Sequence, residues 1–75
     1  APVLTEAQAS ARLSSELSLG KSRLCVIPVR RAELLCYEFE ASRGDGRYLV
    51  YIDAATGETA QLLKLIDVHG GTLTA

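Results

Sequence analysis

The chain has 75 residues, of which 48% are hydrophobic and 23% charged, and its formal net charge is -1 at pH 7. This hydrophobic share is that of a folded globular protein, and the length allows one domain with a thin stability margin. Because the charge is near zero and the cations are scattered, we expect no binding to nucleic acid. No apolar stretch approaches the roughly 20 residues that span a bilayer. The composition therefore predicts a single domain over residues 1–75 without membrane contact of its own.

The first third of the chain predicts a helix. Thr5 and Gln8 have the spacing of a capping box, which marks a helix start. Residues 6–17 are rich in helix-forming residues, and Ala9, Leu13 and Leu17 recur every four residues as one apolar stripe. We expect an amphipathic helix of about three turns. Because the chain begins directly before this helix, we also expect a fragment of a longer protein, with any membrane anchor outside it.

After the predicted helix, apolar and polar residues alternate, which predicts β-strands. The alternation and the turn residues between the runs predict four strands, over residues 24–29, 34–41, 48–53 and 59–68, followed by a short tail over 72–74. Pro28 favours an edge position for the first strand. We therefore expect an α+β fold, in which one N-terminal helix packs on a meandering antiparallel sheet of three to four strands.

The register of the second and third strands follows from the turn between them. Asp45-Gly46 suits a tight hairpin turn. A loop over residues 43–46 then pairs apolar residues only: Ala41 with Tyr48, Phe39 with Val50, and Tyr37 with Ile52. A slip of one residue would destroy every one of these pairs, so the register is strongly specified.

One helix covers one face of a sheet, which leaves a second apolar face. That face is predicted to carry Cys25, Ile27, Val29, Leu34, Cys36, Leu49 and Tyr51. An exposed apolar patch of this size usually marks a contact surface, so we take Ile27, Leu34, Leu49 and Tyr51 as candidate partner-binding residues. The alternative, of equal weight, is that the terminal segments fold over this face or that it belongs to the usual apolar share of a protein surface.

The sequence offers no group of residues suited to catalysis. His69 is the single histidine, and its pairing with Asp67 lacks a nucleophile. Glu38 and Glu40 share one strand face, but a flat face lacks the cleft that paired catalytic carboxylates need. We therefore expect no enzymatic activity, no catalytic or metal-binding residues and no cofactor.

Two cysteines are too few for a zinc site or a disulfide scaffold. Cys25 and Cys36 lie opposite one another if Arg30 and Arg31 alone form the first turn, and a cross-strand disulfide is then conceivable but strained. With a four-residue turn the cysteines are offset. We expect two reduced, half-buried cysteines, and the disulfide stays open as the alternative.

Three segments of the chain resemble the PepSY domain family. They are Leu35-Cys36-Tyr37-Glu38-Phe39, Tyr48-Leu49-Val50-Tyr51-Ile52-Asp53-Ala54-Ala55-Thr56-Gly57-Glu58, and Gly70-Gly71-Thr72-Leu73-Thr74. The second segment matches an aromatic-rich strand that leads into a turn of the D-x-x-T-G-E type. Together the segments are similar to the PepSY domain at the C-terminus of a spore-germination protein. The resemblance spans most of the chain and is weakest over the predicted helix.

The resemblance implies a non-catalytic, extracytoplasmic regulatory domain whose parent protein is anchored at the spore inner membrane. The implied partner is a hydrolase or peptidase of the cell wall or spore cortex, which the domain binds and restrains or stabilises during germination. Asp53, Thr56 and Gly57 match the turn motif and are expected to be structural, and Ala75 is expected at or near the natural C-terminus. Two alternatives stay open: a propeptide-type peptidase inhibitor, and a structural spacer or homodimerisation unit in an ectodomain.

Overall fold

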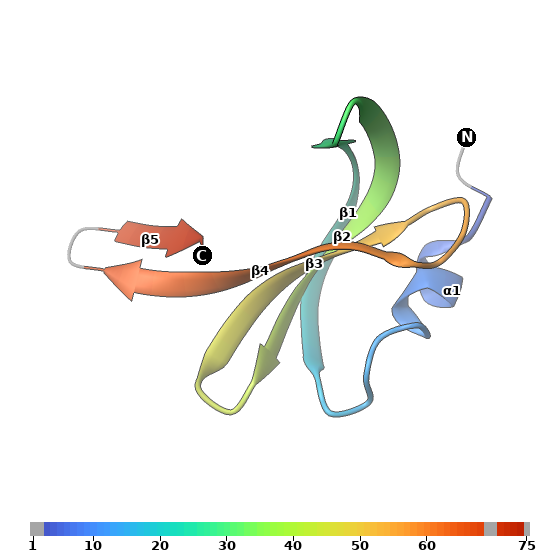
Figure 1. Cartoon of the computed structure of the whole chain (residues 1–75). Helices are drawn as coiled ribbons and strands as arrows, with labels where there is room; N and C mark the ends of the chain where they lie inside the picture. Colours follow the sequence, from blue (N-terminus) through green and yellow to red (C-terminus); the bar gives the residue numbers. More distant parts are fainter. Residues whose placement is uncertain (1–2, 69–70, 75) are drawn as a thin grey trace.

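The fold is an antiparallel sheet with one short helix near its N-terminus (Figure 1). The computed structural model describes residues 3–68 and 71–74, with side chains for residues 3–66. The elements are α1 (Glu6–Ser10), β1 (Ser18–Val29), β2 (Ala32–Arg43), β3 (Gly46–Asp53), β4 (Thr59–Val68) and β5 (Gly71–Thr74). The strand order is β1-β2-β3-β4-β5, so the expected α+β meander is present and β1 is an edge strand. The tail forms β5, a strand more than the three to four expected.

The helix is much shorter than the sequence predicted. The capping box forms, with the Gln8 amide nitrogen donating to Thr5 Oγ1 at 3.1 Å and the Thr5 nitrogen donating to Gln8 Oε1 at 2.9 Å. However, α1 contains only 5 residues and ends at Ser10. Beyond it the chain forms successive turns, and the Ser14 hydroxyl accepts a hydrogen bond from the Glu16 nitrogen at 3.2 Å. Serine side chains compete with helical hydrogen bonds in this way, so the prediction of three helical turns was wrong.

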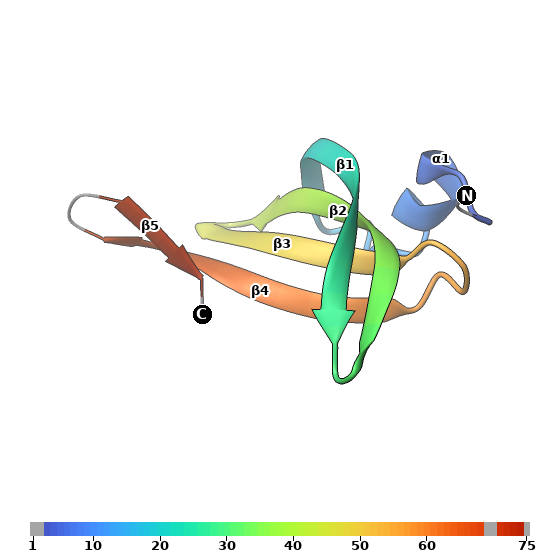
Figure 2. The ribbon, with the colours of Figure 1, turned by 90° about the horizontal axis from the view of Figure 1, so that it is seen from above.

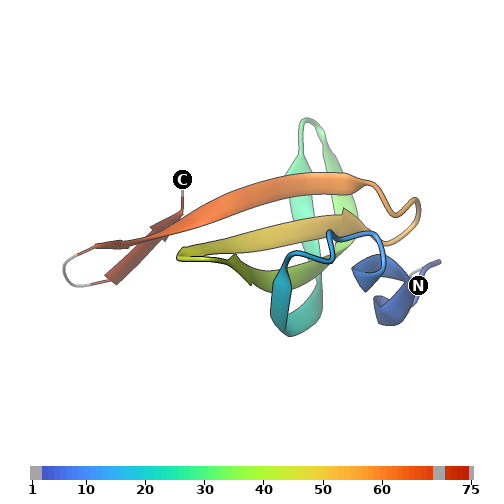
Figure 3. The same ribbon diagram turned by 90° about the horizontal axis from the view of Figure 1, so that it is seen from below.

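The segment over residues 3–17, here called the N-terminal segment, nevertheless packs on the sheet with its predicted apolar stripe. Ala9 is completely buried, and Leu13 and Leu17 contact the same cluster. Hydrogen bonds fix the beginning of the segment, because the nitrogens of residues 3 and 4 donate to the Ala54 oxygen at 3.1 and 2.8 Å. The Tyr37 hydroxyl donates to the Leu4 oxygen at 2.7 Å. Figure 3 shows this segment lying across one face of β2 and β3.

The predicted register between β2 and β3 is confirmed. Ala41 pairs with Tyr48, Phe39 with Val50, and Tyr37 with Ile52. In the first hairpin, Val29 pairs with Ala32, so the turn consists of Arg30 and Arg31 alone. Arg30 adopts the left-handed conformation (φ 56°) that such tight turns require. The two-residue turn decides the question of the cysteines, because it places Cys25 directly opposite Cys36.

The sheet is strongly twisted. Seen from above, the β1–β2 hairpin crosses in front of β3 and β4, while the outer part of β4 and β5 extends away from the other strands (Figure 2). Leu63 of β4 packs against the buried cluster that contains Ile27 of β1 and Tyr51 of β3. Accumulated twist of this kind curves an open sheet.

Candidate binding surfaces

The two faces of the sheet carry separate apolar clusters. The first face, here called the helix face, buries seven residues under the N-terminal segment: Ala9, Tyr37, Phe39, Ala41, Val50, Ile52 and Ala54. The opposite face, here called the cysteine face, buries Ile27, Cys36 and Tyr51, with Cys25, Val29, Leu34, Leu49, Ala60 and Leu63 packed around them. The membership of the cysteine face is the one that the alternation of the sequence predicted, with two residues of β4 added.

The cysteine face is less open than the sequence suggested. Ile27 and Tyr51 are only 9% and 8% exposed, while Leu34 and Leu49 are half-buried. The expectation of an exposed apolar patch is therefore corrected for Ile27 and Tyr51, which are buried. Within residues 3–66, the side chains packed around this cluster belong to β1, β2, β3 and β4. Whether these four residues contact a partner stays a prediction.

A polar group borders the cysteine face. Glu38 of β2 accepts hydrogen bonds from Arg23 Nε at 2.8 Å and from the Tyr51 hydroxyl. Burial acts to raise the pKa of Glu38, but the hydrogen bonds from Arg23 and Tyr51 outweigh it, and the pKa falls below 4.5. Burial and the hydrogen bond to Glu38 raise the pKa of Tyr51 to about 12. The group is thus fully hydrogen-bonded with Glu38 ionised, as expected of a structural network. The predicted register already places Glu38 opposite Tyr51, which is the signal that could have revealed it.

The exposed apolar side chains of the strands gather on the helix face. Residues directly opposite one another in antiparallel strands share a face. Leu24 pairs with Tyr37, Val26 with Leu35, and Leu62 with Val50, so all three lie on the helix face. Their exposed fractions are 44%, 57% and 57%, and Leu19 and Ile66 on the same face are exposed as well. The sequence predicted a helix long enough to cover this face.

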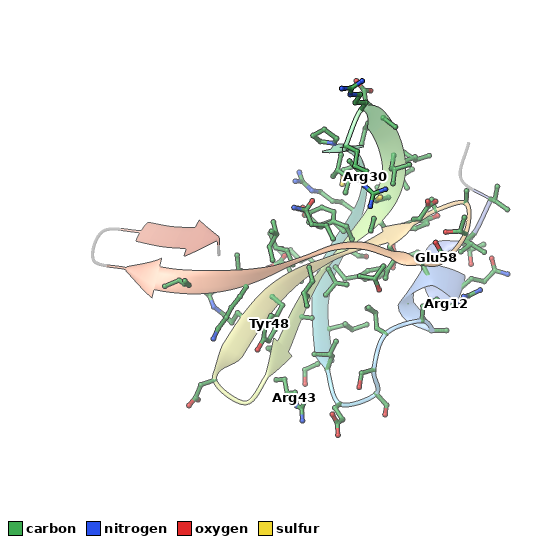
Figure 4. The ribbon with its side chains drawn as sticks, in the orientation of Figure 1. Arg12, Arg30, Arg43, Tyr48 and Glu58 are labelled. Carbon is green, nitrogen blue, oxygen red and sulfur yellow. The ribbon has the colours of Figure 1, made fainter. Side chains whose placement is uncertain are left out.

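An open apolar groove lies where the N-terminal segment ends. Its volume is about 310 Å³, and its lining consists of Ser14, Leu17, Arg43, Tyr48, Val50 and Leu62. Figure 4 shows Arg43 and Tyr48 at this end of the β2–β3 hairpin. An ion pair between Arg43 Nη2 and Glu16 Oε2 at 3.2 Å joins the segment to the hairpin, with both side chains largely exposed. The groove suits an apolar side chain better than a charged ligand, because its lining atoms are mostly carbon.

The turn between β3 and β4 is built by the residues of the D-x-x-T-G-E segment. Asp53 Oδ1 accepts hydrogen bonds from the nitrogens of Ala55 and Thr56 at 2.7 and 3.3 Å, and the Thr56 hydroxyl accepts from the Glu58 nitrogen at 3.2 Å. Gly57 has a φ of +80° and lies against the guanidinium of Arg12. Arg12 and Glu58 are seen together at this end of the sheet in Figure 4. These side chains therefore shape the backbone and help to seat the N-terminal segment.

Within residues 3–66, no three His, Cys, Asp or Glu side chains are grouped so that they could hold a metal ion. His69, the single histidine, lies outside the described residues. In the described part of the chain, no helix has the length and apolar character needed to cross a membrane.

Comparison with known proteins gives one informative match. No family model matches the chain, and no curated protein does. Among solved structures, the Bacillus megaterium YpeB C-terminal domain superposes with a TM-score of 0.85 and 31% sequence identity over 89% of this chain. This chain is similar to the YpeB C-terminal domain. The match confirms the resemblance to a PepSY-like domain of a germination protein that the three sequence segments indicated.

The match covers only 30% of the solved YpeB chain. The present chain therefore corresponds to less than a third of that structure. The likeness supports a domain related to germination at a coarse level. What the whole YpeB protein does is not transferred to this chain by the fold alone.

Proposed function

We propose that this chain is a non-catalytic regulatory domain that binds a hydrolase of the spore cortex or cell wall and restrains or stabilises it during germination. The likeness to the YpeB C-terminal domain, at 31% identity over 89% of the chain, is the observation that carries this proposal. The domain belongs, in this proposal, to a longer extracytoplasmic protein that is membrane-associated through an anchor outside residues 1–75. The side-chain arrangement is compatible with a binding role, because the polar network around Glu38 is satisfied internally and exposed apolar side chains are available.

Two surfaces are available for the partner. The helix face offers Val26 and Leu62, which are both 57% exposed. A partner can therefore bury their apolar surface without any change in the fold. The cysteine face offers the half-buried Leu34 and Leu49, whereas Ile27 and Tyr51 are already buried. The exposed fractions favour the helix face as the principal contact, with the four residues of the cysteine face as the second candidate.

The proposal is tested by measuring the affinity of the 75-residue chain for a purified cortex-lytic hydrolase from the same organism. We expect Leu62→Asp to weaken binding at least tenfold, because it places a charge in a desolvated apolar contact. Gln61→Asp is the matched control for the helix face alone, since this exposed neighbour lies opposite Tyr51 on the cysteine face. Leu34→Ala and Leu49→Ala test the cysteine face. Absence of binding by the unaltered chain would overturn the proposal.

A structural role is the second candidate, and the coverage of the YpeB match favours it. Because the similar structure is about three times as long, the exposed residues of the helix face suit packing against another domain or a second copy of this chain. Sedimentation of the isolated chain distinguishes the homodimer, which Leu62→Asp should dissociate. Inhibition of a peptidase by the chain, without a stable complex with the hydrolase, would instead favour the propeptide-type inhibitor.

A further inference from the structure

The two cysteines of the chain meet on one face of one hairpin. Cys25 of β1 and Cys36 of β2 are directly opposite one another in the antiparallel register. Both belong to the cysteine face, so their side chains point to the same side of the sheet. Neither forms a disulfide in the structure described here. The regulatory function proposed above makes no use of this pair.

The position of the pair in the ladder fixes its spacing. Val29 and Ala32 close the two-residue turn, so they form a hydrogen-bonded pair. From there along the two strands, hydrogen-bonded pairs alternate with non-hydrogen-bonded pairs. Pro28 agrees with this alternation, because it has no N–H to donate and falls at a non-hydrogen-bonded pair. Cys25 and Cys36 thus occupy a hydrogen-bonded pair, whose Cα atoms are typically about 5.5 Å apart. Disulfides span Cα separations of about 4.4–6.8 Å, so this spacing lies within their range. The Cβ atoms of a hydrogen-bonded pair are farther apart than those of a non-hydrogen-bonded pair, so the disulfide carries the strain expected from the sequence.

We propose that Cys25 and Cys36 are a site of reversible oxidation, at which an intrachain disulfide joins β1 to β2. The oxidant is a low-molecular-weight disulfide or the disulfide of a thiol oxidoreductase. The Cys25 thiolate attacks one sulfur of the oxidant, which forms a mixed disulfide and releases one thiol. The Cys36 thiolate then attacks Cys25 Sγ and releases the second thiol. Two protein thiols are oxidised and one external disulfide is reduced to two thiols.

The burial of the two cysteines sets this order of events. Cys36 is completely buried, whereas Cys25 lies on an edge strand and is partly exposed. Cys25 is therefore the sulfur that an external disulfide reaches first, and Cys36 is protected from external attack but adjacent to the mixed disulfide. Burial raises the pKa of both thiols, so oxidation is slow at neutral pH and becomes faster as the pH rises.

The cross-link would stabilise the β1–β2 hairpin. It joins the edge strand to β2 across the turn at Arg30 and Arg31, and it restricts the unfolded chain. In a domain this small, we expect the thermal midpoint to rise by about 5 °C or more on oxidation.

The experiment equilibrates the 75-residue chain with mixtures of oxidised and reduced glutathione, in buffer and in urea that unfolds the chain. Mass spectrometry measures the loss of two hydrogens, and peptide mapping shows whether Cys25 and Cys36 are linked. We expect the native chain to form the disulfide at a lower ratio of oxidised to reduced glutathione than the unfolded chain. Because the same two cysteines are present in both, the comparison isolates the effect of the fold.

Cys25→Ser and Cys36→Ser are the matched controls, and neither should show a shift of thermal midpoint between oxidising and reducing buffer. The proposal is overturned if the native chain needs the same ratio as the unfolded chain or a higher one. It is also overturned if the native chain stops at a glutathione adduct or forms only disulfide-linked dimers. These outcomes do not depend on binding to the hydrolase.

Discussion

The two faces of this sheet bury their apolar residues by different means. On the cysteine face, the strands alone supply the side chains that pack around Ile27 and Tyr51 within residues 3–66. On the helix face, the N-terminal segment supplies a separate layer, which covers the centre of the sheet and leaves Leu62 and Val26 exposed. The comparison teaches that an apolar strand face is not open merely because no helix covers it. Curvature of the sheet can bury side chains on the face without a helix, while the face under the N-terminal segment keeps exposed apolar side chains.

The largest expected effect is the difference in free energy of unfolding lost by truncating a buried residue at the centre of the helix face and an exposed residue at its rim. Phe39 is 2% exposed, and Phe39→Ala should cost about 3–5 kcal/mol, which is most of the stability of so small a domain. Leu62→Ala on the same face should change the free energy of unfolding by about 0.5 kcal/mol or less. Urea unfolding followed by circular dichroism measures both. Equal losses would mean that the rim is as buried as the centre.

The next effect tests how the N-terminal segment is seated on the helix face. At Gly57 the φ is +80°, and a Cβ atom would lie 2.8 Å from Arg12 Cζ, whereas at Gly44 the φ is +59° and no atom lies within 4 Å. Gly44→Ala should cost about 1 kcal/mol for the backbone conformation alone, and Gly57→Ala about 2 kcal/mol. Adding Arg12→Ala to Gly57→Ala should recover part of the stability that Gly57→Ala loses beyond the loss caused by Gly44→Ala. No recovery in urea unfolding would show that the contact with Arg12 is unimportant.

A smaller effect concerns the polar border of the cysteine face. Tyr51→Phe removes the hydrogen bond to Glu38 and should cost about 1 kcal/mol at neutral pH. The pKa of Glu38 is lowered in the folded chain, so its contribution is present above the unfolded pKa and is lost as the pH falls through the folded value. The urea midpoints of the unaltered chain and of Tyr51→Phe should therefore converge as the pH falls. A difference that stays constant down to pH 2 would contradict the ionised state of Glu38.

The smallest expected effect appears in base. Because the pKa of Tyr51 is raised to about 12 from 10.0, this phenol stabilises the fold fully below pH 10, and the contribution disappears as the pH rises toward 12. The difference in tyrosinate absorbance between the unaltered chain and Tyr51→Phe should show one group that titrates near pH 12. A group that titrates near pH 10 would indicate that Tyr51 is more open to solvent than the structure shows.

Much of the fold was predictable because the strands alternate so clearly. The pairing of Phe39 with Val50 followed from the requirement that apolar residues share a face, and the structure has the same pairing. The capping box at Thr5 was also predicted correctly, since it depends on residues three apart. The end of the helix was not, because helix propensity over residues 6–17 did not account for the competition of serine hydroxyls with the backbone.

The candidate surfaces were only half predictable. The sequence correctly assigned Ile27 and Tyr51 to one face, but their burial depends on the curvature of the whole sheet, which no single strand specifies. The exposure of Leu62 depends on where the N-terminal segment stops, which is a property of two segments far apart in the chain. The position of Cys25 opposite Cys36 depended on the length of a single turn, for which the sequence allowed two values.

By itself, the sequence determined the order of the strands and the faces of their side chains, because period-two alternation and turn residues act locally. The likeness to a germination protein came from the resemblance of three segments. The tertiary structure alone decided which apolar side chains are buried, because twist accumulates over several strands and no local pattern of residues records the sum of those small rotations.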